Sequence, residues 1–188
     1  NTELVITGNQ SSDVVIEAIG YKKPPKRAEG LKPLYNTAVD NTGIGLQYKK
    51  EGADVEIRKA TREDVKYKLS VPSKSNIRIL ETNWMGENFS VSSVKGSIEI
   101  EAKSSNIALE EVSGPLVLSS TNGDITVTFD RVNTEAPTSI TSVNGFIDTT
   151  LPSNVKANMK MRSTNGEVYT NFDIELKEDE EKKSSYAV

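Results

Sequence analysis

Apolar and polar residues alternate with a period of two along most of the chain. The clearest stretches are residues 66–71, 97–101 and 124–128. Successive side chains of a β-strand point to opposite faces, so this period indicates strands that are buried on one side. No segment longer than ten residues ahead of the charged C-terminal run shows apolar positions at helical spacing. We therefore expect an all-β protein of roughly 14 or 15 short strands.

An internal repeat runs through the same segments. Its anchor is the tetrapeptide Ser-x-Asn-Gly, which begins at Ser120, Ser142 and Ser163, with a looser copy, Ser-Val-Lys-Gly, at Ser93. The apolar residues two places after the four glycines are Ile125, Ile147, Val168 and Ile98. With weaker anchors included, positions 87, 96, 105, 114 and 123 are evenly spaced, and the next anchors follow at 145 and 166, after steps that each leave room for two strands. A regular spacing of this kind predicts a repetitive β architecture.

The Asn-Gly pairs predict sharp corners between the strands. Glycine adopts positive φ without steric cost, and asparagine tolerates that region better than most residues. We therefore expect Gly123, Gly145 and Gly166 to occupy equivalent corners with positive φ.

Two architectures use such corners. In an antiparallel β-sandwich, Asn-Gly forms the turn of a hairpin. In a parallel β-solenoid of about 18–22 residues per coil, successive strands alternate between sheets and equivalent residues stack in inward ladders. The repeat keeps its phase across the longer steps, which favours the solenoid and leaves the sandwich as the alternative. The ladders expected for the solenoid are Ile77, Ile98 and Leu116 in one sheet and Phe89, Ile107, Ile125, Ile147 and Val168 in the other.

The same phase assigns individual side chains to the interior or to the surface. The residues expected to point inward are Ile98, Ile100, Ile107, Leu109, Leu116, Leu118, Ile125, Val127, Ile147 and Val168. The residues expected to point outward are Glu99, Glu101, Thr126 and Asp148.

The repeat is interrupted at two places within a single expected domain, residues 1–188. Residues 21–42 carry three prolines and a cluster of cations, which predicts an irregular basic insertion that forms a surface loop or caps one end. Residues 177–188 begin with the run Lys-Glu-Asp-Glu-Glu-Lys-Lys, which predicts a solvated loop or a frayed, charged tail.

Composition narrows the classes of function. With 23 basic and 27 acidic residues the net charge is -4, so we expect no nucleic-acid partner. The chain contains no Cys and no His, which removes thiolate and imidazole catalysis and nearly every zinc site. We expect no catalytic residues, no cofactor and no metal. No apolar run approaches the roughly 18 residues that a transmembrane helix requires.

Several motifs occur together in one phase. They are Asp-Asn-Thr-Gly-Ile-Gly-Leu at 40–46, Tyr-Lys-Leu-Ser-Val-Pro at 67–72, Val-Ser-Gly-Pro at 112–115, the three Ser-x-Asn-Gly copies, and Ser-Val-Asn-Gly-Phe-Ile-Asp at 142–148 followed by Leu151 and Pro152. Together they resemble the DUF4097 family of adhesin-like bacterial β-solenoid proteins. The resemblance implies an exported protein at the cell surface or in the periplasm, with its signal peptide removed, and it supplies no catalytic residues.

Six residues are candidates for binding a partner, namely Trp84, Phe146, Lys22, Lys23, Lys26 and Arg27. Trp84 lies in a longer interval of the repeat, where a loop either presents the ring to a glycan or protein or packs on the flank of the fold. Phe146 has the outward phase. The four cations form a positive patch on an acidic protein, which suits an anionic envelope polymer, and capping of the solenoid end is the alternative.

Two other groups of residues have weaker claims to a function. Residues 43–45, Gly-Ile-Gly, lack the third glycine and the following helix of a nucleotide loop, so a strand corner is favoured. Asp124, Asp148 and Glu167 follow corners, but no calcium-loop motif accompanies them, so solvated carboxylates are favoured.

The favoured function is a non-enzymatic binding or structural module that recognises a glycan, an envelope polymer or a surface protein. The first alternative is a polysaccharide-active enzyme, because Glu99 and Glu101 share one strand face and paired carboxylates hydrolyse glycosides. A groove that holds two carboxylates and an Arg or Lys would favour that alternative. The second alternative is a partner in envelope-stress signalling, which the sequence neither supports nor excludes.

Overall fold

The computed structural model describes residues 2–28, 31, 38–82, 84, 86–178 and 184–187. Side chains are described as far as residue 174. The described residues form β-strands and one short 3₁₀ helix, η1 (Lys26–Ala28), so the all-β prediction is confirmed. The strands assemble into two large sheets and two small ones.

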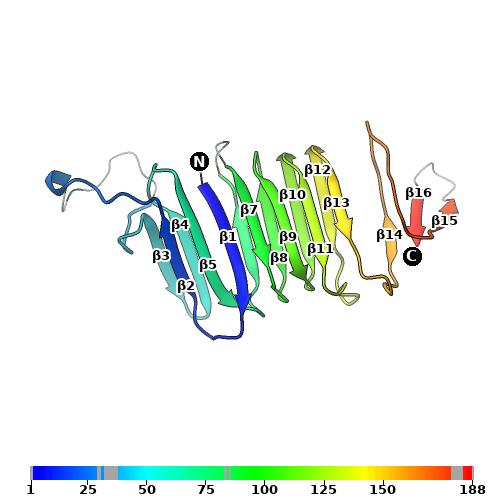
Figure 1. The fold of residues 1–188 in the computed structure, drawn as a ribbon, viewed down its shortest axis with the longest axis horizontal. Helices are drawn as coiled ribbons and strands as arrows, with labels where there is room; N and C mark the ends of the chain where they lie inside the picture. The colour runs from blue at the N-terminus through cyan, green and yellow to red at the C-terminus, as the bar shows by residue number, and fades with distance from the viewer. Residues whose placement is uncertain are drawn as a thin grey trace.

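The larger sheet has seven strands, six of them parallel to one another. They are β1 (Thr2–Asn9), β2 (Val15–Ile19), β5 (Val65–Pro72), β7 (Asn88–Ser92), β9 (Asn106–Val112), β11 (Ile125–Phe129) and β13 (Ile147–Thr150). Their order is β13-β11-β9-β7-β1-β5-β2, and only β2 is antiparallel to its neighbour. The first strand of the chain therefore lies inside the sheet, between β5 and β7 (Figure 1).

The second large sheet has four strands, all parallel. They are β6 (Ile77–Leu80), β8 (Ile98–Ala102), β10 (Leu116–Asn122) and β12 (Ser139–Asn144), in the order β12-β10-β8-β6. From β6 to β13 the chain alternates between the two sheets at every strand. The antiparallel sandwich is therefore wrong, because these consecutive strands are not hairpin partners and their ladders are parallel.

The predicted ladders appear in the strand register with one exception. Ile77 pairs with Ile98 and Ile98 with Leu116 in the four-stranded sheet. In the seven-stranded sheet the ladder consists of Phe89, Ile107, Ile125 and Ile147. The fifth expected member, Val168, belongs to no strand.

The inner faces of the two sheets enclose the main apolar core. The predicted inward residues that are buried there are Ile98, Ile100, Ile107, Leu109, Leu116, Leu118, Ile125 and Val127. The prediction is wrong for Ile147 and Val168, which are 44% and 48% exposed. β13 is the edge strand of its sheet, so nothing pairs along its outer side to cover Ile147. Of the predicted outward residues, Glu101, Thr126 and Asp148 are exposed and Glu99 is half-buried.

The corner glycines are required mostly for a reason other than positive φ. Gly145 has φ 146°, whereas Gly123 and Gly166 do not have positive φ, so the prediction is wrong for those two. A Cβ atom on Gly123 would lie 2.3 Å from the Ser105 carbonyl oxygen, and one on Gly145 would lie 2.3 Å from that of Gly123. Stacked corners approach so closely that only glycine fits between them.

Two smaller sheets occupy the ends. β3 (Leu46–Glu51) and β4 (Asp54–Lys59) form an antiparallel hairpin, and a second apolar cluster is centred on Leu46, Val65 and Tyr67. β14 (Asn158–Lys160), β15 (Glu175–Glu178) and β16 (Ser184–Ala187) form an antiparallel sheet at the other end (Figure 1). The expected loop or frayed tail at 177–188 thus includes β16 and the end of β15, because strand-forming residues flank the charge run, of which 179–183 lie outside the described residues.

Candidate functional site

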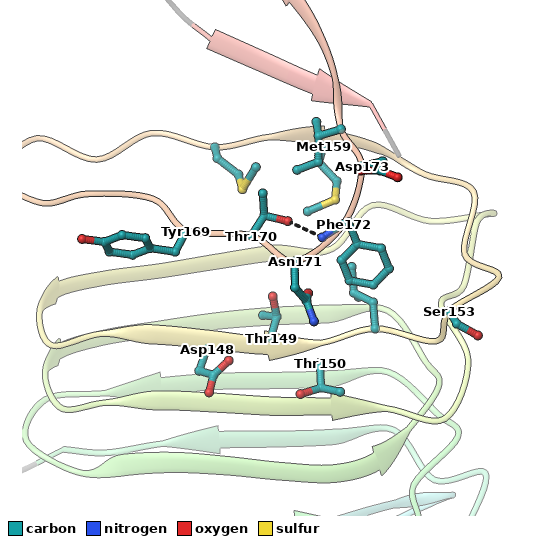
Figure 2. Close-up of a pocket in the computed structure, with 13 residues that line it drawn as sticks. Asp148, Thr149, Thr150, Ser153, Met159, Tyr169, Thr170, Asn171, Phe172 and Asp173 are labelled. Carbon is teal, nitrogen blue, oxygen red and sulfur yellow. Dashed lines mark hydrogen bonds between the residues drawn. The ribbon is translucent and has the colours of Figure 1, made fainter.

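A hollow of ≈ 970 Å³ lies between β13 and residues 159–174, and we call it the C-terminal hollow. Its lining combines apolar side chains such as Met159 and Phe172 with the hydroxyls of Thr149 and Thr170 (Figure 2). The only charged residues in the lining are Asp148 and Asp173. The described lining therefore provides no cation that would assist a carboxylate in acid-base chemistry.

Two hydrogen bonds beside the C-terminal hollow, each with a side-chain acceptor, join residues that are close in sequence. The Phe172 amide donates to the Thr170 hydroxyl over 3.0 Å. The Tyr169 hydroxyl donates to the Glu167 carboxylate, and this bond raises the pKa of Tyr169, with a smaller contribution from burial. Tyr169 is itself 84% exposed. These bonds join neighbours in sequence, and neither of them reaches β13.

The two candidate aromatic residues are both exposed. Trp84 is 59% exposed, and the Lys103 Nζ atom lies 5.6 Å from its ring centroid and donates to the Thr82 carbonyl over 3.0 Å. Phe146 is 58% exposed, and its amide donates to the Asp124 carboxylate over 3.1 Å. Both residues lie on connections from the four-stranded sheet to the seven-stranded sheet, three strand positions apart. At about 4.8 Å per strand, they are separated by roughly 14 Å along that edge.

The four candidate cations are exposed. Lys22, Lys23, Lys26 and Arg27 precede or belong to η1, which projects beyond the end of the sheets that carries β3 and β4 (Figure 1). The structure does not bring them together with Trp84 or Phe146. The predicted insertion at 21–42 is described at residues 21–28, 31 and 38–42.

The Gly-Ile-Gly segment is a corner that leads into β3, as predicted, and an aspartate organises it. Asp40 accepts hydrogen bonds from the amides of Thr42, Gly43 and Gly45 at 2.8–2.9 Å and from the Tyr21 hydroxyl at 2.9 Å. Burial alone would raise the pKa of Asp40, but these donors lower it to about 2. Sequence reasoning missed this role, although an aspartate shortly before Thr-Gly is typical of such a turn.

A buried carboxylate was also missed. Glu81 is 7% exposed and accepts hydrogen bonds from the Lys103 amide at 2.5 Å, the Ser104 amide at 2.9 Å and the Ser105 hydroxyl at 2.9 Å. A Cβ atom on Gly86 would lie 1.8 Å from the Glu81 Oε1 atom, so glycine makes room for the carboxylate. The sequence did contain a signal for this burial, because Glu81 lies two residues after Ile79 and therefore shares the inward phase of Ile79.

The paired carboxylates of β8 lie on an outer sheet face. Arg78 contacts both of them, with Nε 3.3 Å from Glu99 Oε1 and Nη2 3.6 Å from Glu101 Oε1. All three side chains are 42% to 67% exposed. Neither the C-terminal hollow nor the smaller hollow beside the β3–β4 hairpin includes them. Two carboxylates and an arginine therefore share a face, and neither of these two hollows supplies the groove that the enzyme alternative calls for.

The corner carboxylates do not gather into a cation site. Asp124 accepts the Phe146 amide, Glu167 binds Tyr169, and Asp148 is exposed in β13. Across the described part of the chain, no three acidic residues lie close enough together to hold a metal ion.

These features define a class of all-β proteins built from stacked parallel strands with glycine corners. The chain belongs to the Toastrack DUF4097 family, whose match covers residues 88–188 and therefore includes β7 to β16. No curated protein and no solved structure matches the chain. Within the described residues, no helix is long and apolar enough to cross a membrane.

Proposed function

We propose that the chain is a non-enzymatic module in which β1 and β5 to β13 form one two-sheeted parallel β-solenoid. The strand register supports this reading. Asn88 pairs with Asn106 in the seven-stranded sheet, and Ile77 with Ile98 and Asn122 with Asn144 in the four-stranded sheet. Each of these steps returns the chain to the same sheet after one visit to the other, which is what a coil of a solenoid does.

The observation that carries the non-enzymatic assignment is that polar side chains at the coil corners accept hydrogen bonds from backbone amides. Glu81, Asp124 and Asn106 each accept a backbone amide from the next coil. A general acid or base has to reach a proton on its substrate, and the carboxylates of Glu81 and Asp124 are already engaged in holding coils together. These corner side chains therefore serve the fold.

Recognition then falls to the projections from the solenoid. The cationic segment formed by Lys22, Lys23, Lys26 and Arg27 extends away from the sheets and is exposed. Loops on a rigid scaffold carry binding groups without disturbing its core. On a protein of net charge -4, this segment is suited to an anionic envelope polymer. Family membership is consistent with export to the cell surface or periplasm and an adhesin-like role.

The test replaces the four cations of the segment by Ser and measures retention on isolated envelope material at low and high salt. We expect the variant to lose binding with little change in melting temperature, and wild-type binding to weaken as salt rises. A matched control changes three exposed lysines and one exposed arginine elsewhere, Lys50, Lys74, Lys95 and Arg131, to Ser. Equal binding by the two variants would overturn the assignment of this segment.

A second candidate function rests on the cluster of Arg78, Glu99 and Glu101. Two carboxylates beside an arginine are the groups that a polysaccharide-active enzyme would use. Glu99→Gln and Glu101→Gln variants separate the two functions. Turnover of a polysaccharide by the intact chain that both variants lose would establish the enzyme, whereas envelope binding that both variants retain supports the non-enzymatic module.

A further inference from the structure

Successive copies of Ser-x-Asn-Gly hold neighbouring coils together through the same residues of the motif. The Ser142 hydroxyl donates to the Gly123 carbonyl over 3.3 Å, and the Asn144 side-chain amide donates to the Asn122 side-chain oxygen over 2.9 Å. The Gly123 amide donates to the Asn144 carbonyl over 3.0 Å. Gly145 permits this approach because a Cβ there would collide with the Gly123 carbonyl. Each specified residue of the motif thus has a partner in the preceding copy.

The last copy, residues 163–166, has the same Ser, Asn and Gly but none of these partners. No hydrogen bond within the described residues joins it to residues 142–145. Apart from the two adjacent residues, the only described atom within 4 Å of a Cβ on Gly166 is the hydroxyl of Ser163, in the same copy. The last copy therefore has the Ser, Asn and Gly that make contacts between coils in the preceding copy, but it does not make those contacts.

The length of chain before the last copy suits another coil. Asn165 follows Asn144 by the same number of positions as separates the paired residues Ile77 and Ile98. This shift aligns Met161 with Ile140, Val168 with Ile147 and Phe172 with Leu151. Each alignment places one apolar residue upon another, as in the ladders of the core.

The last coil of the solenoid lacks the cover that the earlier coils have. β12 and β13 are the edge strands of their sheets, so each has one side without a neighbouring strand. Ile147 is 44% exposed, whereas its partner Ile125 in the preceding strand is 0% exposed. An apolar ladder position and two open strand edges therefore lie at the end of the stack that carries the C-terminal hollow.

The segment across the hollow already runs in the required direction. Figure 2 shows Tyr169, Thr170 and Asn171 following one another in the same direction and order as Asp148, Thr149 and Thr150 of β13. These are the pairs that the shift between Asn144 and Asn165 predicts. Asn171 and Phe172 are directed from this segment toward β13 (Figure 2).

We propose that residues 161–172 dock on β12 and β13 as a further coil, closing the C-terminal hollow, and that the structure holds this strap in its undocked position. On docking, Asn165 takes the place on Asn144 that Asn144 has on Asn122, and Val168 covers Ile147. The hollow is then filled by the chain's own side chains rather than by a ligand. This inference goes beyond the proposed function and does not depend on what the basic segment binds.

Engineered disulfides test the docking directly, because the chain contains no cysteine that would compete. The test pair is Asp148→Cys with Tyr169→Cys, which the docked register places on neighbouring strands, about 4.8 Å apart and within disulfide range. The reference pair is Thr126→Cys with Asp148→Cys, which are partners in β11 and β13. The off-register control is Asp148→Cys with Glu167→Cys, which docking separates by roughly 8 Å.

The relative oxidation rates of the three cysteine pairs show whether the segment docks. Docking predicts that the 148–169 pair oxidises about as fast as the 126–148 pair and at least tenfold faster than the 148–167 pair. Equal, slow oxidation of the 148–169 and 148–167 pairs would overturn the proposal. The Tyr169–Glu167 hydrogen bond is lost in both double variants, so its loss does not distinguish them.

Hydrogen exchange tests the same point without a cross-link. Val168→Asp replaces a residue that is 48% exposed in the undocked position, where the change is harmless, and places a charge in the interior on docking. Docking predicts exchange at the amides of β13 at least tenfold faster in this variant than in wild type. The control is Val143→Asp at a position that is 70% exposed and outward in β12, where exchange at β13 is unchanged. No difference between the two variants would also overturn the proposal.

Discussion

Asp40 illustrates how a single carboxylate organises a corner that has little regular structure. Its oxygens accept three backbone amides and two hydroxyls, and its pKa of about 2 lies below the ordinary value of 3.8. The Tyr67 hydroxyl donates to the carbonyls of Ile44 and Gly45 in the same corner, and burial, with a smaller contribution from Asp40, raises the pKa of Tyr67 to about 12. The corner therefore depends on the charged form of Asp40.

The lowered pKa of Asp40 predicts a specific acid sensitivity. Because the folded-state pKa is below the unfolded-state value, Asp40 stabilises the chain above about pH 4, and this contribution is lost as pH falls toward about 2. Asp40→Asn should lower the free energy of unfolding by about 1 kcal/mol at pH 7 and flatten its decline between about pH 4 and 2. Urea unfolding across this pH range measures both effects. Asp54→Asn, at an exposed hairpin position, is the control, and identical pH profiles for wild type and Asp40→Asn would contradict the interpretation.

Gly123 has to be glycine because neighbouring backbone approaches it closely, and not because of its own backbone conformation. Its φ is not positive, but the Ser105 carbonyl occupies the space that a side chain would need. Gly123→Ala should therefore lower the free energy of unfolding by about 1–3 kcal/mol. Gly43→Asn is the matched comparison, because Gly43 has φ 73° with nothing within 4 Å, a conformation that asparagine tolerates. Thermal unfolding that ranks the two variants in the opposite order would contradict steric exclusion at the corners.

At the scale of the strands, the period of two in the sequence predicts which face of a strand is buried, but it does not predict which strand lies at the edge of its sheet. It placed Ile98, Leu116 and Ile125 correctly because a buried ladder position needs an apolar residue in every strand that contributes to it. The same pattern continues through Ile147 and Val168, where the structure has no covering strand. Alternation along a strand contains no information on whether another strand lies beside it. The partners of Glu81 were also missed, because they are the amides of Lys103 and Ser104, far along the chain.

The buried ladder predicts a large effect of truncation at its centre. Ile125 is 0% exposed and lies between Ile107 and Ile147 in the register. Ile125→Ala should lower the free energy of unfolding by about 2–5 kcal/mol, because the stacked neighbours leave a cavity. Val117→Ala, at an outward position that is 52% exposed, should change it by less than about 0.5 kcal/mol. A denaturant titration of both variants checks the pair, and a loss below about 0.5 kcal/mol for Ile125→Ala would argue against a packed ladder.

At the scale of the whole molecule, the candidate surfaces lie at opposite ends of the stacked sheets. The cationic segment projects beyond β3 and β4, and the C-terminal hollow lies beyond β13 (Figure 1). Sequence analysis singled out the cations by their clustering and Phe146 by its outward phase, which are local properties, whereas it left open whether Trp84 projects or packs on the flank. It did not locate the hollow, which depends on how far residues 159–174 stand from β13.

The position of β1 predicts that substitutions in β1 and substitutions in the repeat change different rate constants, those of unfolding and of folding. Thr2 pairs with Val65, so this contact closes a far longer loop than the contacts between neighbouring strands of the repeat, such as Asn88 with Asn106. Closing the longer loop costs more entropy, so β1 should join after the repeat has formed. Ile6→Ala, at a position that is 4% exposed, should therefore mainly accelerate unfolding, and Leu109→Ala should slow folding. Stopped-flow rates in denaturant test this order, and a slower folding rate for Ile6→Ala than for Leu109→Ala would contradict it.

The same placement has a consequence for any process that delivers the chain with its N-terminus first. β1 pairs with β5 and β7, which both follow it in the chain, so its first neighbour is complete only after residue 72 and its second only after residue 92. During that interval its backbone groups are open to foreign strands, which is the situation that holdase chaperones relieve. Slow passage of residues 10–92 should therefore be the stage at which this protein is most prone to aggregate.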